Sequence, residues 1–302
     1  MHINEVKISH LDNKPVKFKG IIYPIPIKEN IQAPFYCAIA CGLRGSGKTY
    51  AIVKMLQNAE KSGFIEPRTG EKCAIRHILF SPTIHGNPIF NTLKYLDEDD
   101  IHNDYSEAKL QEVLDELQAD REETDERLRY IDAYNKFSKM SKKEFEKWRD
   151  VESILMLEQY DFANPRELPP IKYPNGCITN IILDDCLSNK EAFSSKKVSV
   201  LNKLVLNGRH YKANAIIASQ NLKAINKSIR INTQVWMLFR TKSMKVLMDD
   251  IYPEVSNILT EDEFLQIYEK ATQNENDFLC IDEKDKKENR FKRNFDVILK
   301  IE

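Results

Sequence analysis

The sequence lacks long apolar runs, paired cysteines and a leader pattern. No segment approaches the roughly 18 consecutive apolar residues of a membrane span, so we expect none. The six cysteines stand apart without a C-x-x-C pair, which favours buried free thiols in a reducing compartment over a disulfide framework or a zinc site. The first residues, Met1 to Glu5, lack the basic-then-apolar order of a signal peptide, so we do not expect secretion.

Charge of one sign is also missing. The net charge is −1 over 302 residues, so the chain has no global positive field, and any surface for nucleic acid must be local. A hydrophobic content of 42% with 30% charged residues is typical of a globular protein with a substantial core. Composition therefore leaves the function open.

Glycine is scarce, yet three of the nine glycines fall in one short stretch. Residues 42–49, Gly-Leu-Arg-Gly-Ser-Gly-Lys-Thr, match G-x-x-x-x-G-K-[ST], the phosphate-binding P-loop. The apolar run 35–40 before it predicts a buried strand, and Ala51, Ile52, Met55 and Leu56 after it recur at helical spacing. A chance glycine-rich turn would not be expected to have both flanks, so the sequence predicts a nucleotide-binding protein.

Phosphate binding here follows from backbone chemistry. Glycines let the loop turn its N–H groups inward, and the dipole of the following helix favours negative charge. We expect Lys48 to reach the β- and γ-phosphates of ATP and the Thr49 hydroxyl to hold Mg²⁺. The expected nucleotide-binding residues are Gly42, Leu43, Arg44, Gly45, Ser46, Gly47, Lys48, Thr49 and Tyr50.

Another apolar run, 177–183, ends in Asp184 and Asp185. Such a pair can be a simple turn at a strand end. After a P-loop and one intervening strand at 75–80, the pattern instead predicts the acidic half of an NTPase site. Asp184 would act on Mg²⁺, and Asp185 would orient or deprotonate the attacking water.

A third apolar run, 213–219, ends at Gln220. We interpret Gln220 as a sensor of the γ-phosphate; its alternative is a polar cap on a strand end. Between the last two runs, a short amphipathic helix is predicted to end at Asn207-Gly208, followed by Arg209. No N-K-x-D guanine motif and no L-S-G-G-Q signature is present. The pattern favours ATPases with an acid after the Walker B aspartate and a polar sensor on an adjacent strand.

The sequence predicts an α/β fold with a mostly parallel central sheet flanked by helices. Residues 1–34 would form an N-terminal extension, and 35–302 a P-loop ATPase domain. The charge-rich segment from about 97 to 165 is predicted to be a helical insertion. It has one apolar stripe over 110–117, another beginning at 128, and a capping box at 141–144. Runs 278–281 and 295–299 would be two closing strands around a charged turn.

These motifs together resemble the DNA-packaging ATPases of poxviruses, other large eukaryotic DNA viruses and virophages, within the FtsK/HerA-like superfamily. The resemblance covers roughly 35–300 and is weakest over 97–165. The P-loop is generic, whereas Gly-Arg-His-Tyr followed by a strand ending in Ser-Gln is the specific signal. The matching stretches are Ile78-Leu79-Phe80-Ser81-Pro82-Thr83, Ile182-Leu183-Asp184-Asp185, Asn207-Gly208-Arg209-His210-Tyr211, Ile216-Ile217-Ala218-Ser219-Gln220, Asp277-Phe278-Leu279-Cys280-Ile281-Asp282 and Arg290-Phe291-Lys292-Arg293-Asn294-Phe295-Asp296.

The resemblance implies roles for individual residues. Lys48 and Thr49 would act on nucleotide and Mg²⁺, Asp184 on Mg²⁺, and Gln220 as sensor. Asp185 stands where the wider superfamily usually has the longer Glu. Arg209 is the candidate arginine finger acting on a neighbouring subunit; its alternative is a surface or helix-end arginine.

The resemblance also implies partners and a location. It implies a homo-oligomeric ring that moves double-stranded DNA, capsid vertex proteins as partners, and a place in the host cytoplasm, viral factory or virion. DNA would be held without sequence specificity by pore-facing loops. The candidate segments are 188–197, just after the acidic pair, and Lys223, Lys227 and Arg230; the alternative for each lysine is a solvated loop.

Three other functions fit parts of the sequence. A replication helicase or initiator ATPase would share the site but separate strands. A small-molecule or nucleotide kinase would need an arginine-rich lid, which the 97–165 segment could supply, but has no need of Gln220. A nucleotide-gated interaction module would bind ATP without useful turnover.

Overall fold

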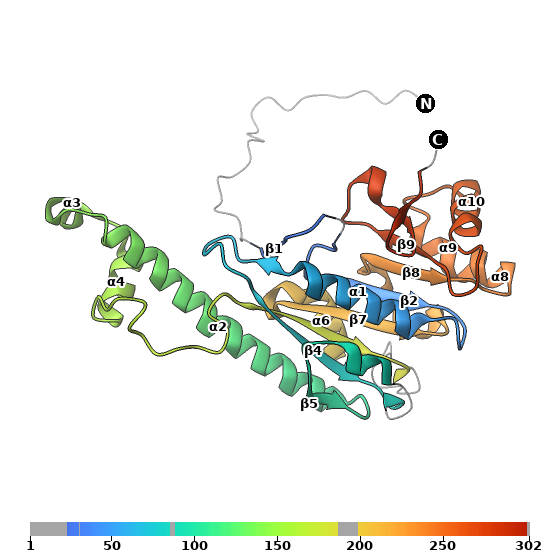
Figure 1. The fold of residues 1–302 in the computed structure, drawn as a ribbon, viewed down its shortest axis with the longest axis horizontal. Helices are drawn as coiled ribbons and strands as arrows, with labels where there is room; N and C mark the ends of the chain where they lie inside the picture. The colour runs from blue at the N-terminus through green and yellow to red at the C-terminus, as the bar shows by residue number, and fades with distance from the viewer. Residues whose placement is uncertain (1–22, 30, 85–87, 187–198, 301–302) are drawn as a thin grey trace, which may run out of the picture.

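The computed structural model describes residues 23–29, 31–84, 88–186 and 199–300, and these are built around one nine-stranded sheet. Its strand order is β11-β10-β9-β8-β2-β7-β6-β4-β5 (Figure 1). The strands are β2 Cys37–Cys41, β4 Ala74–Phe80, β5 Leu96–His102, β6 Cys177–Leu183, β7 Ala213–Ser219, β8 Val235–Phe239, β9 Phe278–Asp282, β10 Phe291–Arg293 and β11 Val297–Ile298.

The six strands from β8 to β5 are mutually parallel, and β9, β10 and β11 continue the sheet in antiparallel fashion. The central strands read as unbroken apolar runs because helices cover both of their faces. This confirms the predicted α/β fold with a mostly parallel sheet. Strand β7 lies between β2 and β6, so the strand that ends at Gln220 separates the P-loop strand from the Asp184 strand.

Helix α1, Lys48–Ser62, covers one face of the sheet with the 3₁₀ turn η2, Pro88–Thr92. The other face is covered by the first half of α2, by α6 and by C-terminal helices, which share a single apolar core. The remaining helices and turns are α2 Glu107–Phe137, α3 Lys142–Lys147, α4 Val151–Gln159, α6 Val200–Tyr211, η4 Leu222–Ala224, α7 Lys227–Ile231, α8 Met244–Val246, η5 Leu247–Ile251, α9 Tyr252–Val255, α10 Glu261–Ala271 and η6 Lys287–Asn289.

The charge-rich segment forms a helical arm. Its two predicted apolar stripes belong to one uninterrupted helix, α2, whose N-cap Ser106 accepts a bond from the Lys109 N–H. The second half of α2 leaves the sheet and packs with α4 around Tyr130 and Leu157, and Phe137 at its end contacts Phe145 of α3. Figure 1 shows this arm extending from the end of the sheet opposite to the tips of the parallel strands. The capping box that opens α3 forms as predicted.

Other boundaries differ from the sequence interpretation. The segment predicted as an insertion begins with β5, an edge strand of the main sheet, so its helical part starts at Glu107. Helix α6 does not end at Asn207-Gly208: Asn207 has φ −115°, which kinks the helix, and the helix continues to Tyr211. The predicted closing turn contains a third strand, β10, because its residues 291–293 pair with β9.

The N-terminal part that the structure describes joins the fold through a small second sheet. Strand β1, Ile25–Pro26, pairs antiparallel with β3, Phe64–Ile65, which follows α1. Among the described residues, no helix is long and apolar enough to cross a membrane. All six cysteines lie in the described part of the chain as free thiols; five are buried, as predicted, and Cys177 is half-buried.

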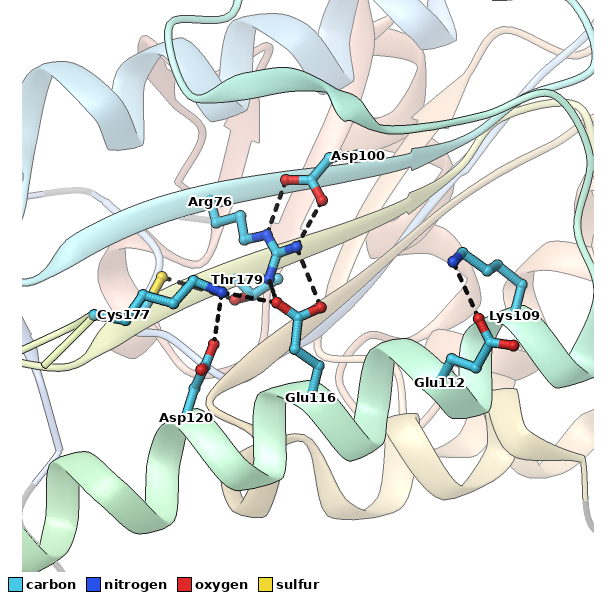
Figure 2. A network of polar contacts seen from close by, with 9 residues as sticks. Arg76, Asp100, Lys109, Glu112, Glu116, Asp120, Cys177 and Thr179 are labelled. Carbon is cyan, nitrogen blue, oxygen red and sulfur yellow. Dashed lines mark hydrogen bonds and ion pairs between the residues drawn. The ribbon is translucent and has the colours of Figure 1, made fainter.

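A polar network fastens α2 to the sheet edge. Figure 2 shows the Arg76 guanidinium of β4 between two carboxylates, Asp100 of β5 and Glu116 of α2. It donates to both Asp100 oxygens at 2.8 and 2.7 Å and to Glu116 Oε1 at 2.8 Å. Lys172 Nζ adds bonds to Glu116 at 2.7 Å and Asp120 at 3.2 Å. Arg76 thus ties an edge strand, its neighbour and the arm helix together.

Replacing Arg76 by methionine should destabilise the fold strongly, because Asp100 is buried and would keep an unpaired charge. We expect a loss of about 3–5 kcal/mol in the free energy of unfolding, measured by urea denaturation. Lys109→Met is the matched control: its ion pair with Glu112 on the same helix is exposed and should be worth less than about 1 kcal/mol. Equal effects of the two substitutions would contradict this role of Arg76.

Candidate nucleotide-binding site

The P-loop follows β2 at the carboxyl edge of the parallel strands and leads into α1. The Gly42 N–H donates to the Ser219 carbonyl of β7 at 3.1 Å, which fixes the start of the loop to the neighbouring strand. Gly45 and Gly47 have φ of +77° and +94°, values that side chains rarely tolerate, and Gly47 caps α1. The predicted strand, loop and helix are therefore present in the predicted order.

Gly42 has a steric reason to be glycine. A Cβ at this position would lie 2.6 Å from Phe239 Cβ and 2.6 Å from Ser46 Oγ. Phe239 is the last residue of β8, the strand on the other side of β2 from β7. The loop is thus pressed between the ends of two strands, and its path leaves no room for a side chain at its first glycine.

Lys48 folds back over the loop. Its Nζ donates to the carbonyls of Gly42 at 3.0 Å and Leu43 at 2.9 Å, which leaves its third proton for a ligand. Burial lowers the pKa of the Lys48 ammonium, and the nearby carboxylates of Asp185 and Asp184 oppose that shift. The ammonium is held where a phosphate enclosed by the loop would meet it.

An unpaired hydroxyl in the loop also indicates a phosphate position. Ser46 Oγ is buried and finds no hydrogen-bond partner among the described residues. Buried hydroxyls are normally paired, so an orphan inside a phosphate-binding motif indicates a ligand position. The N–H groups at the start of the 15-residue α1 point to the same place.

Asp184 lies at the carboxyl end of β6 beside Thr49. The Thr49 hydroxyl lies 3.3 and 3.2 Å from the two Asp184 oxygens, so one hydroxyl and one carboxylate meet across the site. Burial first, and then the charge of Asp185, raise the pKa of Asp184 to about 6, against the Thr49 bond and the Lys48 charge. This oxygen pair suits Mg²⁺, which uses one or two protein oxygens with phosphates and waters.

Asp185 follows directly but faces solvent. Its backbone is left-handed, with φ +53°, while Asp184 remains 2% exposed. The turn therefore sends two successive carboxylates to different places: Asp184 lies buried beside Thr49, and Asp185 lies on the open side of the site. Such a division suits a ligand and a separate group that acts on water.

Gln220 follows β7 at the same edge, exposed, and shares a cavity wall with Gly42 and Leu43 of the P-loop and with Arg240. The parallel sheet thus brings together the P-loop, the acidic pair and Gln220, because all of them follow carboxyl ends of adjacent strands.

Arg209 lies elsewhere. Helix α6 runs back across the sheet, so Arg209 sits at the amino edge, with its guanidinium 5.7 Å from the Tyr23 ring centroid. The seven-residue β7 that follows spans about 20 Å, which places Arg209 too far away to reach the P-loop of its own chain. A role on a neighbouring subunit stays a prediction.

Only some of the candidate DNA-binding residues lie in the part of the chain that the structure describes. The segment 188–197 lies outside the described residues. Lys223 pairs with Asp250 at 2.5 Å, and Arg230 pairs with Glu254. These two cations are therefore partly neutralised, which favours the interpretation as ordinary surface residues for them; Lys227 is exposed.

Sequence reasoning missed Asn276. It precedes β9 in a left-handed conformation, φ +66°, and with its amide nitrogen turned to the P-loop it donates to the carbonyls of Gly45 and Ser46, both at 3.3 Å. The sequence signal, Asn-Glu-Asn-Asp at 274–277, indicates only a turn. The contact arises because β9 lies two strands from β2, which local patterns do not reveal.

The P-loop motif, the strand order of the sheet and the Thr49–Asp184 contact together identify the class of fold. The chain has the fold and the phosphate site of a P-loop NTPase. No protein-family model matches the sequence. A curated relative, "Uncharacterized protein 015R" of Frog virus 3 (isolate Goorha), is 27% identical over 94 residues, which span 31% of this chain and 28% of the relative.

Solved structures similar to this chain include viral and cellular ATPases. The genome packaging NTPase B204 of Sulfolobus turreted icosahedral virus 2 in complex with ATP-gammaS has a TM-score of 0.37 at 15% identity, covering 82% of this chain and 93% of B204. The cytoplasmic domain of the type VII secretion ATPase EccC of Thermomonospora curvata has a TM-score of 0.37 at 16% identity, covering 74% of this chain and 25% of that one.

The Asp184 assignment predicts a metal-specific defect. Asp184→Asn should lower the apparent Mg²⁺ affinity of the ATP complex by about 10- to 100-fold, while ATP binding in excess chelator is retained. Titration of Mg²⁺ against a fluorescent ATP analogue measures both. Asp185→Asn removes the same charge from the adjacent residue and should affect Mg²⁺ affinity far less. Equal losses in both variants would show that Asp184 has no special place in the metal site.

Proposed function

We propose that the chain is an ATP-hydrolysing translocase that packages double-stranded viral DNA into a capsid as a homo-oligomeric ring. The observation that carries the ATPase part is the contact of Thr49 with Asp184, across a sheet in which β7 places Gln220 between them. The packaging part is supported by the sequence stretches that resemble viral packaging ATPases, above all Arg209-His210-Tyr211 and Ser219-Gln220.

The proposed hydrolysis uses the residues of the carboxyl edge. The P-loop N–H groups and Lys48 hold the phosphates, and Lys48 offsets the charge that develops on the β- and γ-phosphate oxygens. Thr49 and Asp184 would hold Mg²⁺, which supplies charge neutralisation at the phosphates when bound. The buried position of Lys48 strengthens its electrostatic effect, since little water is present to screen it.

Asp185 and Gln220 would act on the attacking water. Asp185 is exposed beside the metal position and would accept the proton of the water or orient it. Its side chain is one methylene shorter than Glu, so the left-handed turn at Asp185 would set its reach. Gln220, level with the P-loop at the end of β7, would hydrogen-bond the γ-phosphate or the water and report the nucleotide state to β7.

The position of Arg209 supports the ring part of the proposal. Arg209 lies at the far edge of its own sheet, so it could act as a finger only on the nucleotide of a neighbouring subunit. Such a site would be completed at an interface and would couple hydrolysis to the ring. Double-stranded DNA in the ring, capsid vertex proteins, and a place in the host cytoplasm, viral factory or virion belong to the same proposal.

The kinase alternative loses its structural support. It needed the 97–165 segment as a lid over an acceptor beside ATP. The helical arm instead extends from the opposite end of the sheet, where Thr124 of α2 donates to the Tyr173 carbonyl and Asp125 pairs with Arg68 (Figure 1). An arm directed away from the P-loop does not enclose a substrate there.

A DNA-displacement assay tests the function. With ATP and Mg²⁺, the protein should strip a third strand from a duplex that carries a short triplex, and should leave a forked duplex unseparated. Lys48→Ala is the control and should displace no third strand, because it lacks the phosphate-binding ammonium. Strand separation on the fork would instead assign a helicase, and no action on either substrate would contradict a DNA motor.

A further inference from the structure

A second cavity adjoins the P-loop on the side away from Asp184. It has a volume of about 730 Å³ and begins at Gly47 and Tyr50, where the loop enters α1. Its far wall comes from the turn before β9 and from the turn after β10. Cavities of roughly 300–1,000 Å³ hold small organic ligands, so this space suits one.

The near wall is one stripe of α1. Gly47, Tyr50, Lys54 and Asn58 follow each other at steps of three and four residues, so they share one helix face, and Ala51 adjoins Tyr50 on it. The Tyr50 side chain is 63% exposed although it is a large aromatic ring. An aromatic ring left open at the mouth of a cavity offers a flat surface on which a planar ligand can stack.

The far wall is held in place by side-chain hydrogen bonds and an aromatic contact. Asp277 accepts bonds from the side-chain amides of Asn294 at 2.9 Å and Asn274 at 2.8 Å, and Asn294 accepts the Phe278 N–H at 3.2 Å. Phe278 and Phe295 pack edge to face with ring centroids 5.1 Å apart. This wall is linked to the loop itself, since Asn276 reaches the carbonyls of Gly45 and Ser46.

The order of the strands gives the direction of the ligand. Asp184 ends β6 on one side of the P-loop strand, whereas the wall with Phe278 begins β9 on the other side. The γ-phosphate must face the metal and water groups near Asp184. The α-phosphate and whatever it carries then leave the loop on the β9 side, towards Tyr50.

We propose that this cavity is the nucleoside subsite: the base stacks on Tyr50 and the ribose lies against the Asn276–Asp277 turn. This inference rests on the proposed binding of ATP to the P-loop. The charges agree with it, because Glu275, Asp277 and Asp296 outnumber Lys54 in the lining. Acidic groups repel phosphates but accept hydrogen bonds from ribose hydroxyls and exocyclic amines.

The C-terminal strands thereby gain a role in ligand binding. They were expected only to close the sheet, yet β9 carries the wall that contacts the P-loop. Because Asn276 contacts the carbonyls of Gly45 and Ser46, a ligand in the subsite would affect these two hydrogen bonds. A nucleotide would therefore join the C-terminal part of the chain to the phosphate loop.

Filling the cavity should separate nucleoside binding from phosphate binding. Lys54→Trp places a large side chain in the space from an exposed helix position. We expect the ATP affinity to fall about tenfold or more, because the stacked base is displaced, while the affinity for inorganic tripolyphosphate stays within about twofold. Lys61→Trp, an exposed lysine of the same helix outside the cavity, is the matched control and should change neither affinity.

Isothermal calorimetry with the full chain, Mg²⁺ and each ligand measures these affinities. A second variant, Phe295→Ala, removes part of the far wall and should also weaken ATP but not tripolyphosphate. If wild type binds tripolyphosphate and both wall variants bind ATP as tightly as wild type, the subsite is wrong while the P-loop function stands. If wild type binds neither ligand, the proposed function itself fails, and the subsite with it.

Discussion

The bond between the Gly42 N–H and the Ser219 carbonyl is the contact on which the site depends. It aligns the P-loop with the end of β7, and β7 in turn pairs in register with β6, so Asp184 is placed by the same ladder. Parallel pairing forces the ends of these strands to one edge. Lys48, Thr49, Asp184 and Gln220 meet there although they come from segments up to about 170 residues apart in the sequence.

The carboxyl and amino edges of the parallel strands carry different groups of residues. The carboxyl edge carries the phosphate loop, the acidic pair and the polar end of β7. The amino edge carries Arg209, the Tyr23 contact and the base of the helical arm, which the Arg76 network fixes to the sheet. A ring in which Arg209 serves a neighbour's nucleotide would bring the amino edge of one subunit to the carboxyl edge of the next. Such head-to-tail contacts are heterologous and close into rings when the rotation fits.

The sequence predicted what local patterns encode. The P-loop, the apolar strand runs and the acids at the end of β6 all rest on short spacings, and strands β6 and β7 have the expected bounds. The reach of α6 past Asn207-Gly208 was not predicted, because packing against the sheet overrides the turn preference of that pair. Strand β10 and the contact of Asn276 with the P-loop depend on partners distant in sequence, for which a single sequence carries no signal.

The most direct test of an ATP-driven DNA motor is the ATPase rate per subunit measured against protein concentration, with and without duplex DNA. A site completed by a neighbour's Arg209 should be nearly inactive in dilute monomer, rise steeply as subunits assemble, and rise further with duplex DNA, while Lys48→Ala stays inactive throughout. A rate per subunit that is independent of concentration and unchanged by DNA would contradict both the shared site and the motor.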